Sequence, residues 1–398
     1  MSFKKILVIH AGLYELGGGD FFVCRILRLL QNDFDVTLLH LGKELEPETF
    51  KKYYNIDLDF NRIKVIRPPL SNFFAKLKRN ALLKYAIALR YARKICKNYD
   101  LVFSTYGECP LKHENIIQYI HIPLFSTEKE GLYHLGVRTS NKLVHAVRIL
   151  YVHVCRFIAG WNKELIKKNT TVVNSLWTGE RVKNAYGISN IICIYPAVDE
   201  PPSDVHLKPF KDRKNDFVMI GRIHKNKRVE LGIQFVEALK KDGHNVHLHI
   251  VGPLIGPYAK ELVMLVENKN YVSLSGGLSR KEMMRLIGNC RYGFHAYEYE
   301  HFGVAPAEMQ RLGCIVFVPN SGGQVEVIGN ENQRYSNLME AIEKAETIMN
   351  SIEIQDKILK GMEKLNNKFT TTSFNQQMET LIKNKLHMRS GETEEKLG

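Results

Sequence analysis

A short apolar run followed by a glycine turn and an amphipathic segment occurs twice in the chain, and this repeat limits the fold more than any other feature. In the first copy, residues 4–30, KKILVIHAG leads through LYELGGG into DFFVCRILRLL. In the second, which starts at Asp216, DFVMIGRIHKNK is followed by VELGIQFVEALK. A buried strand, a glycine turn and a helix in this order begin a Rossmann-like unit. The sequence therefore predicts two such units in tandem.

The length of the chain agrees with two domains. Its 398 residues exceed the ~250–300 at which a single hydrophobic core stops growing. After residue 216, apolar runs alternate with helical patterns, which predicts a parallel sheet with helices on both faces. Residues 195–216 carry four prolines and many charges, which favours a linker. We predict a first domain of residues 1–200, joined by a C-terminal helix at about 373–388, and a second domain of residues 201–372.

Cysteine usage, hydropathy and charge narrow the class of protein. The seven cysteines are scattered and never form C-x-x-C, so neither a disulfide framework nor a zinc cluster is indicated, and a cytoplasmic protein is expected. No apolar stretch is long enough to cross a bilayer, because the best candidate, residues 143–161, contains Arg148 and Arg156. The net charge of +14 favours a negatively charged partner.

The stretch HAYEYEHFGVAPAEMQRLG, residues 295–313, holds the strongest candidate for a ligand site. In a doubly wound domain ligands bind at the carboxyl ends of strands, and Glu300 follows the predicted strand RYGFHAY. Gly303 lets the backbone approach a ligand, and Pro306 fits only the first turn of a helix. A helix N-terminus also favours acidic side chains without any ligand, so one glutamate alone does not decide. An anion cradle with two flanking carboxylates is predicted from Glu300, Phe302, Gly303, Val304 and Glu308.

Two cations are expected at the same edge of the second sheet. GRIHKNK places Arg222 and Lys227 just after Gly221, which forms the turn after a predicted strand that ends at Ile220. Two cations on this turn suit a diphosphate. NSGGQVEVIG, residues 320–329, supplies a further glycine-rich turn between a strand and a helix. The combination predicts a nucleoside diphosphate that carries two polyols, ribose and a sugar, for the carboxylates to bind.

Six segments in order carry a family resemblance that covers nearly the whole chain. They are GGGD (17–20), QYIHIP (118–123), VNSLWT (173–178), YPAVD (195–199), GRIHKNK (221–227) and EHFGVAPAEMQRLG through NSGGQVEVI (300–328). Each is weak alone, but together they resemble the retaining glycosyltransferases of the GT-B fold, family four. Among these, the chain is most similar to the lipid-linked oligosaccharide mannosyltransferases of the dolichol pathway and their microbial relatives. The resemblance implies two Rossmann-like domains that face each other across a cleft.

The resemblance also implies roles for the residues of the second domain. Glu308 would bind the ribose hydroxyls, and Glu300 would bind the transferred sugar. Arg222 and Lys227 would bind the diphosphate and, with the helix N-terminus, stabilise it as a leaving group in place of a divalent metal.

In the first domain, the resemblance implies that His121 reaches the sugar and that Gly18 and Gly19 line the phosphate or acceptor side of the cleft. Two departures from the family pattern are visible. The first loop offers Asp20 where the family more often has a glutamate, which affects the expected acceptor contacts. Residues 305–307 replace an aliphatic run, which we expect to change only packing.

Metal-binding patterns in the sequence have simpler explanations. Two Asp-x-Asp sequences, at 33–35 and 57–59, match metal-dependent transferases, but the first lies at a helix-to-strand entry and the second in a polar surface stretch. His247 and His249 share one face of a predicted strand, where packing or an edge position is favoured over a metal site. We predict no metal site and no cofactor, the nucleotide sugar being a substrate.

Residues 62–97 form a strongly basic segment. Between Asn61 and Asp100 there are eleven Lys or Arg residues against a single acid, Asp100. The aromatic residues Phe73, Phe74, Tyr85 and Tyr91 interleave with these cations, a pattern compatible with nucleic-acid binding, with an anionic membrane surface or with a solvated basic face. We favour the membrane, because it suits a lipid-linked acceptor. A peripheral protein on the cytosolic face of a membrane is therefore expected, and no nucleic-acid partner.

The sequence as a whole predicts an enzyme that moves a sugar, with mannose favoured, from a nucleotide diphosphate to a hydroxyl of a glycan or lipid-linked glycan. Two alternatives stay open. One is a non-catalytic protein of the same fold that binds a sugar nucleotide or nucleic acid, and the other is a GT-B epimerase that acts on a free sugar nucleotide. The choice between a guanine and a uracil donor also stays open.

Overall fold

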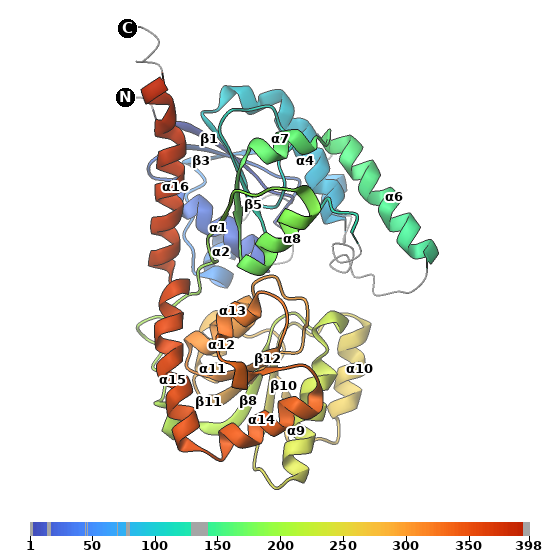
Figure 1. Ribbon diagram of the computed structural model, residues 1–398, viewed down its shortest axis with the longest axis vertical. Coiled ribbons are helices and arrows are strands. Elements are labelled where there is room, and N and C mark those ends of the chain that lie inside the picture. Colours follow the sequence, from blue (N-terminus) through green and yellow to red (C-terminus); the bar gives the residue numbers. More distant parts are fainter. Residues whose placement is uncertain are drawn as a thin grey trace. The chain divides into compact units, whose positions relative to one another are not determined.

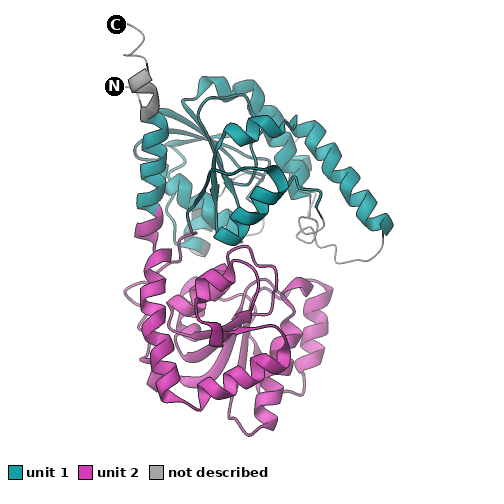
Figure 2. Ribbon diagram, viewed as in Figure 1, with its two compact units in different colours: residues 1–194, 375–398 teal, residues 195–374 magenta. Residues whose placement is uncertain are grey.

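The computed structural model describes residues 3–13, 17–43, 45, 47–69, 71–76, 80–128 and 142–392, which form two compact units (Figure 2). Unit 1 comprises residues 1–194 and 375–398, and unit 2 comprises residues 195–374. Each unit is built on its own parallel sheet flanked by helices (Figure 1). The prediction of two Rossmann-like units is confirmed.

The sheet of unit 1 has seven strands in the order β3-β2-β1-β4-β5-β6-β7. Every neighbouring pair is parallel, so all carboxyl ends meet at one edge. The strands are β1 (Lys5–Ile9), β2 (Asp35–Leu39), β3 (Ile63–Ile66), β4 (Leu101–Ser104), β5 (Ile116–Ile120), β6 (Thr170–Val173) and β7 (Ile191–Cys193). The helices described in this unit or running through it are α1 (Gly18–Leu30), α2 (Pro47–Tyr54), α3 (Ser71–Lys76), α4 (Ala81–Ile95), α6 (Lys142–Ala159), α7 (Lys163–Lys168), α8 (Leu176–Tyr186) and α16 (Thr371–Glu392).

The sheet of unit 2 has six strands in the order β10-β9-β8-β11-β12-β13, again all parallel. The strands are β8 (Lys214–Ile220), β9 (Leu248–Val251), β10 (Val272–Leu274), β11 (Cys290–Phe294), β12 (Ile315–Pro319) and β13 (Arg334–Tyr335). The helices are α9 (Val229–Lys241), α10 (Pro257–Val266), α11 (Arg280–Ile287), α12 (Val304–Arg311), α13 (Gln324–Ile328), α14 (Leu338–Met349) and α15 (Ile352–Asn366).

Both sheets have a switch point, where chain connections leave in opposite directions from two neighbouring strands. In unit 1 it lies between β1 and β4, and in unit 2 between β8 and β11. The crevice outside the carboxyl ends of such strands is where open α/β sheets bind ligands. The topology therefore marks one candidate position in each unit.

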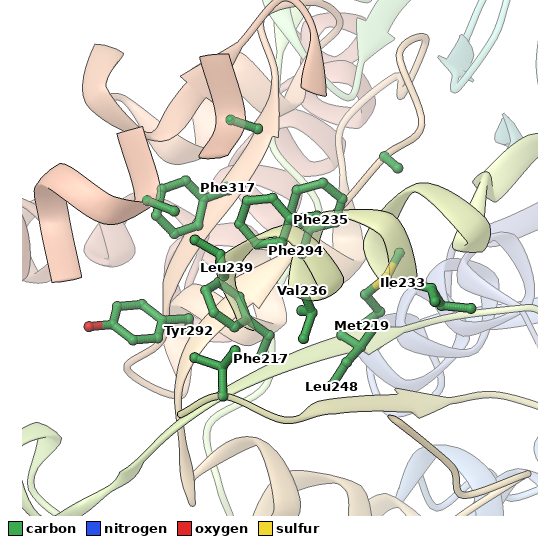
Figure 3. Close-up of a cluster of buried hydrophobic side chains, with 14 of the residues drawn as sticks. Phe217, Met219, Ile233, Phe235, Val236, Leu239, Leu248, Tyr292, Phe294 and Phe317 are labelled. Atoms are coloured by element: carbon green, nitrogen blue, oxygen red, sulfur yellow. The ribbon is translucent and has the colours of Figure 1, made fainter. Parts of the chain in front are cut away.

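Aromatic packing fixes the sheet of unit 2 against its helices (Figure 3). The rings of Phe235 from α9 and Phe294 from β11 stack with their centroids 4.4 Å apart, and those of Phe217 and Tyr292 stack at 5.0 Å. All four side chains are buried. Aromatic pairs of this kind add to the free energy of burial, so β8 and β11, the strands of the switch point, are held rigidly together.

The predicted linker, residues 195–216, belongs entirely to unit 2. Val198 is buried, its N–H donates to the Phe369 carbonyl at 2.7 Å, and Tyr195 packs edge-on against the Phe369 ring. The division between the units accordingly falls at Ile194 and Tyr195, a few residues before the predicted boundary. The prolines therefore mark an extended segment that packs on unit 2 through residues such as Tyr195 and Val198.

The long helix of the basic segment packs into the core of unit 1. In this helix, α4, Tyr85 and Lys84 are buried, and the Tyr85 hydroxyl lies within hydrogen-bond distance of the Gly107 carbonyl, at 3.0 Å. An interleaved aromatic and cationic surface is therefore wrong for this helix, because its aromatic residues pack inward. Lys78 and Arg79, which belong to the same segment, lie outside the described residues.

Candidate functional site

The switch point of unit 2 brings two predicted site residues into contact. Lys227 follows β8 through the turn at Gly221, and Glu300 follows β11. The Lys227 Nζ lies 2.6 Å from the Glu300 Oε2, and the same ammonium lies 4.7 Å from the centroid of the Tyr297 ring. Because an ammonium carries three N–H donors, its bond to Glu300 leaves capacity for phosphate oxygens. A cation and a carboxylate thus occupy the place where this fold class binds ligands.

Glu300 is held as a carboxylate by its neighbours. The His295 Nε2 lies 3.2 Å from the Glu300 Oε2, and since an ionised carboxylate only accepts hydrogen bonds, His295 is the donor. Burial alone would raise the pKa of Glu300, but the charge of Lys227 and the His295 bond outweigh burial and hold that pKa far below its usual range. Burial also lowers the pKa of His295. At neutral pH the pair is a charged Glu300 and a neutral His295, so the carboxylate can accept bonds from hydroxyl groups.

The loop that carries Glu300 rests on the second glycine turn, residues 320–323. The Gly323 N–H donates to the Glu300 carbonyl at 2.8 Å, and the Gln324 side-chain amide donates to the Tyr297 carbonyl at 2.9 Å. Gly303 has φ of +96°, and a Cβ there would lie 3.0 Å from the Gln324 Cβ. Only glycine meets both demands without strain, so the turn and the Glu300 loop form one rigid structure.

Glu308 lies on α12 and pairs with a residue that the sequence analysis did not single out. The Arg280 Nη1 lies 2.7 Å from the Glu308 Oε1, and the Arg280 Nη2 lies 3.7 Å from the Asp199 Oδ2. Burial lowers the pKa of Arg280, but the charges of Glu308 and Asp199 outweigh it and raise that pKa. Glu308, the residue predicted to bind ribose, is therefore held in place by an arginine from α11.

A signal for Arg280 was present in the sequence. Ser279 is followed three residues later by Glu282, the sequence pattern of a capping box, and the structure forms this box, which makes Arg280 the first residue of α11. A cation in the first helical turn opposes the helix dipole, so it needs a nearby carboxylate to be favourable there. A positive charge directly after an N-cap is thus a reason to search for an acidic partner.

The other predicted residues of unit 2 lie on the two loops already described. Arg222 is exposed and follows Gly221, whose φ of +133° forms the turn after β8. Val304 is the first residue of α12. Phe302 is buried and its ring lies 5.5 Å from that of Phe369, so its side chain belongs to the core and a ligand could reach only its backbone.

The switch point of unit 1 is occupied by a histidine. His10 directly follows β1, and its Nδ1 lies 3.0 Å from the Thr105 Oγ1, which follows β4. The His10 Nε2 lies 3.7 Å from the Asp20 Oδ1. Asp20, the residue that departs from the family pattern, is therefore next to the switch-point histidine.

The other predicted residues of unit 1 lie at the same edge of its sheet. His121 directly follows β5 and packs edge-on against Phe22, and burial together with the charge of His10 lowers its pKa from 6.5 to about 3. Gly18 and Gly19 begin α1, and a Cβ at Gly19 would meet no atom within 4 Å. Packing therefore does not require glycine at position 19, and the first N–H groups of α1 are left accessible to an anion.

The sequences that resembled metal sites have structural roles. His247 and His249 both lie within hydrogen-bond distance of the Ser273 hydroxyl, at 3.1 and 2.9 Å. Asp35 begins β2, and the Asp59 carboxylate accepts from the Asn61 N–H at 2.9 Å in a turn. Within the described parts of the chain, no three or more His, Cys, Asp or Glu residues are grouped so that they could hold a metal ion.

Comparison with protein families matches residues 205–369, which contain all the predicted site residues of unit 2, to Glycosyl transferases group 1. This match identifies the region, which lies within unit 2, as a group 1 glycosyltransferase domain.

The curated proteins to which this chain is similar are distant relatives. A GDP-Man:Man(3)GlcNAc(2)-PP-Dol alpha-1,2-mannosyltransferase of Eremothecium gossypii is 26% identical over 52% of this chain and 38% of its own length. The protein of the same name from Dictyostelium discoideum is 23% identical over 78% of this chain and 70% of its own length. The human alpha-1,3/1,6-mannosyltransferase ALG2 is 26% identical over 30% of this chain and 32% of its own length. The match thus spans well under half of the first and third of these proteins.

Solved structures match this chain over almost its whole length. Anabaena Alr3699/HepE, solved in complex with UDP and glucose, has a TM-score of 0.65 at 14% identity, with 96% of this chain and 99% of that chain covered. WaaG, described as a glycosyltransferase involved in lipopolysaccharide biosynthesis, has a TM-score of 0.67 at 13% identity, with 95% and 99% covered. At such identities the likeness shows the fold alone, and that fold is GT-B.

Proposed function

We propose that the protein transfers a glycosyl group, with mannose as the favoured sugar, from a nucleoside diphosphate donor to a hydroxyl of a glycan or lipid-linked glycan. The observation that carries the proposal is the contact of Lys227 and His295 with Glu300 at the switch point of unit 2, inside the region that matches the family. The preference for mannose rests on the names of the curated relatives, which are mannosyltransferases.

The chemistry of the site fits a sugar nucleotide better than a smaller anion. The ionised Glu300 would accept bonds from hydroxyls of the transferred sugar, and Glu308, held by Arg280, would accept bonds from the ribose. Lys227 and Arg222 would bind the diphosphate. One ligand then satisfies two carboxylates and two cations, which neither a free sugar nor a free phosphate could do.

Leaving-group stabilisation is the main catalytic effect in this proposal. As the bond to the sugar breaks, negative charge grows on the diphosphate, where Lys227, Arg222 and the N–H groups at the start of α12 would stabilise it. These residues would do so without a divalent metal. The acceptor hydroxyl would lose its proton to the leaving phosphate, and the anomeric configuration would be retained.

Unit 1 would supply the acceptor side. His121 would contact the transferred sugar through an imidazole that burial keeps neutral, and Gly18 and Gly19 would offer the N–H groups of α1 to the phosphate or acceptor. A neutral imidazole can donate one hydrogen bond and accept another, which suits a hydroxyl group. We assign the acceptor to unit 1 and the donor to unit 2.

Membrane association completes the proposal. The names of two curated relatives give their substrate as Man(3)GlcNAc(2)-PP-Dol, a glycan on a lipid carrier, and the net charge of +14 suits an anionic surface. We therefore propose that the protein works as a peripheral protein on the cytosolic face of a membrane.

The test combines donor binding with acceptor-dependent turnover. Thermal unfolding is measured against a panel of GDP- and UDP-sugars, since a bound ligand raises the unfolding temperature. Release of free nucleoside diphosphate is then measured with and without a glycan acceptor for the wild type, Lys227→Met and Glu300→Gln. Lys240→Met on α9 is the matched control.

The expected result is a shift with one sugar nucleotide and an acceptor-dependent release that both site variants reduce while Lys240→Met does not. Binding without acceptor-dependent release would overturn the proposal in favour of a sugar-nucleotide binding protein. Interconversion of the donor sugar without release would instead show an epimerase. Loss of release on metal chelation, restored by manganese, would contradict the proposed role of the cations.

A further inference from the structure

Helix α6 of unit 1 exposes an apolar stripe along its whole length. The stripe follows the spacing i, i+4, i+7, i+11 and i+14, which places its members on one face of a helix. Its members and their exposed fractions are Leu143 (71%), Val147 (60%), Leu150 (64%), Val154 (47%) and Phe157 (82%). At 1.5 Å per residue the 18 residues of α6 extend over about 27 Å, and the stripe from Leu143 to Phe157 covers about 21 Å of this, or about four turns. We call these five residues the outer stripe.

The same helix is also apolar on the face that packs on unit 1. Val152, Cys155 and Ala159 are buried against the cluster that contains α4. A helix that is hydrophobic on opposite faces is normally covered on both. The exposure of the outer stripe is therefore a feature that the fold of unit 1 leaves without an explanation.

Helix α6 lies beside α4 and points in the same direction (Figure 1). The Leu83 N–H, near the start of α4, donates to the Tyr151 hydroxyl at 3.3 Å, and Arg93, near its end, donates to the Ala159 carbonyl at 2.7 Å. The buried residues of α6 all belong to its second half. The first half, including Leu143 and Val147, therefore extends past the start of α4 and presents apolar side chains away from the core.

Charge around α6 favours an anionic surface as the partner. Neither α6 nor α4 contains a single acidic residue. The C-terminal half of α4 carries the exposed cations Arg90, Arg93 and Lys94, and Lys97 follows it. A partner protein that buried this stripe would have to cover these cations as well, whereas an anionic bilayer satisfies the apolar stripe and the cations together.

A helix of this kind lies in the membrane interface and does not cross it. No helix among the described residues is long and apolar enough to span a bilayer. Lys142 begins α6, Arg148 and Arg156 interrupt its apolar sequence, and the Arg156 guanidinium donates to the Phe125 carbonyl at 2.9 Å. One face of α6 is therefore fixed to unit 1 while the other is accessible to lipid.

We propose that the outer stripe of α6 inserts into the interface of an anionic lipid bilayer and is the membrane-docking surface of this protein. The proposal rests on the membrane association in the proposed function, but not on the sugar transfer. The apolar part of this surface comes from α6, and its cationic part comes from the exposed end of the basic segment, at Arg90, Arg93, Lys94 and Lys97.

The test compares two triple variants that remove equal amounts of exposed apolar surface. Leu143→Gln, Leu150→Gln and Phe157→Gln change the outer stripe. Ile255→Gln, Met264→Gln and Ile352→Gln change residues of unit 2 with exposed fractions of 78%, 74% and 77%. Flotation is measured with vesicles of phosphatidylcholine and phosphatidylglycerol and with vesicles of phosphatidylcholine alone. A circular dichroism spectrum equal to that of the wild type shows that each variant is folded.

We expect the wild type and the unit 2 variant to float with the mixed vesicles, and the α6 variant to partition at least about tenfold less. In a separate measurement, brominated lipids should quench the fluorescence of the tryptophan added by Leu150→Trp. They should not quench that of the tryptophan added by Met264→Trp. The shift in unfolding temperature with a donor sugar should be the same in the α6 variant as in the wild type. A missing shift in all proteins with intact vesicle binding would refute the sugar transfer and leave this proposal standing.

Two results would overturn the docking surface. One is equal flotation of the α6 variant and the wild type. The other is a wild type that forms dimers in sedimentation, does not float, and becomes monomeric in the α6 variant, which would show that a second copy of the chain covers the outer stripe.

Discussion

His40, at the carboxyl end of β2, should make unit 1 sensitive to acid. The side chain is completely buried, its Nδ1 accepts the Gly42 N–H at 2.9 Å, and no described residue hydrogen-bonds its Nε2. Burial, with smaller effects from the charges of His10 and Arg67, lowers the pKa of His40 from 6.5 to about 3. We expect His40→Asn to remove this sensitivity, because the asparagine oxygen can replace Nδ1 as the acceptor for Gly42 but does not titrate.

The size of the effect follows from the two pKa values. The folded pKa lies below the unfolded one, so the stabilising contribution of neutral His40 is complete above pH 6.5 and is lost as the pH falls toward 3. At about 1.4 kcal/mol per pH unit, the loss between pH 7 and pH 5 is about 2 kcal/mol. Burial raises the pKa of Glu108 to about 7, so the contribution of Glu108 to the free energy of unfolding grows over the same interval as the pH falls. The difference between the wild type and His40→Asn isolates the histidine from this opposing effect.

The prediction is tested by measuring the free energy of unfolding in urea at pH 7 and pH 5, with tryptophan fluorescence as the signal. The only two tryptophans of the chain, Trp161 and Trp177, both belong to unit 1, so the signal reports that unit. His153→Asn, which replaces an exposed histidine of α6, is the control. The wild type should lose about 2 kcal/mol more than His40→Asn between the two pH values. Equal losses in the two proteins would refute the reasoning.

Three further predictions concern the site. Glu308→Gln should weaken donor binding about 10- to 150-fold in calorimetry, because a charged hydrogen bond contributes roughly 1.5–3 kcal/mol. Adding Arg280→Ala should lower the donor affinity less in this variant than it does in the wild type. Strictly additive losses of affinity would show that the two residues do not act together. Gly303→Ala should lower the free energy of unfolding by more than about 1 kcal/mol, since φ at this position is +96° and the added Cβ would crowd Gln324. Gly361→Ala in α15, where an added Cβ meets no atom within 4 Å, should raise the free energy of unfolding. An unchanged stability of Gly303→Ala would contradict the argument that the loop is rigid. His121→Ala should lower turnover far more than the affinity for the donor nucleotide, and an equal loss in both would place His121 in the nucleotide site.

The contact between Lys227 and Glu300 could be anticipated because it follows from chain order. Each residue comes shortly after an apolar run that ends in a turn, and in an α/β unit such positions share one edge of the sheet. The glycine turn at residues 320–323 was also visible, but its function was not. It hydrogen-bonds the Glu300 loop from the next strand, a contact between segments about twenty residues apart that no local pattern specifies.

Arg280, His295 and α6 show where the sequence was insufficient. The partner of Arg280 is determined by how α11 packs beside α12, and the bond between His295 and Glu300 depends on the path of a loop. In the sequence, the stretch that forms α6 can be recognised only as an apolar run that Arg148 and Arg156 make unsuitable for crossing a membrane. Which of its apolar residues face the core depends on its packing against α4, so the outer stripe could be identified only from the structure.

The support of the Glu300 loop by the neighbouring glycine turn has a consequence for anyone who wishes to engineer this protein to accept another donor. A Cβ at Gly322 would lie 2.4 Å from the Glu300 carbonyl oxygen, so neither loop tolerates randomisation by itself. The turn after β8 differs, because a Cβ at Gly221 would meet no atom within 4 Å and Arg222 and His224 are exposed. A library directed at the exposed positions 222, 224 and 225, which leaves the buried Ile223 unchanged, would therefore vary the surroundings of the proposed donor site while most of its members still fold.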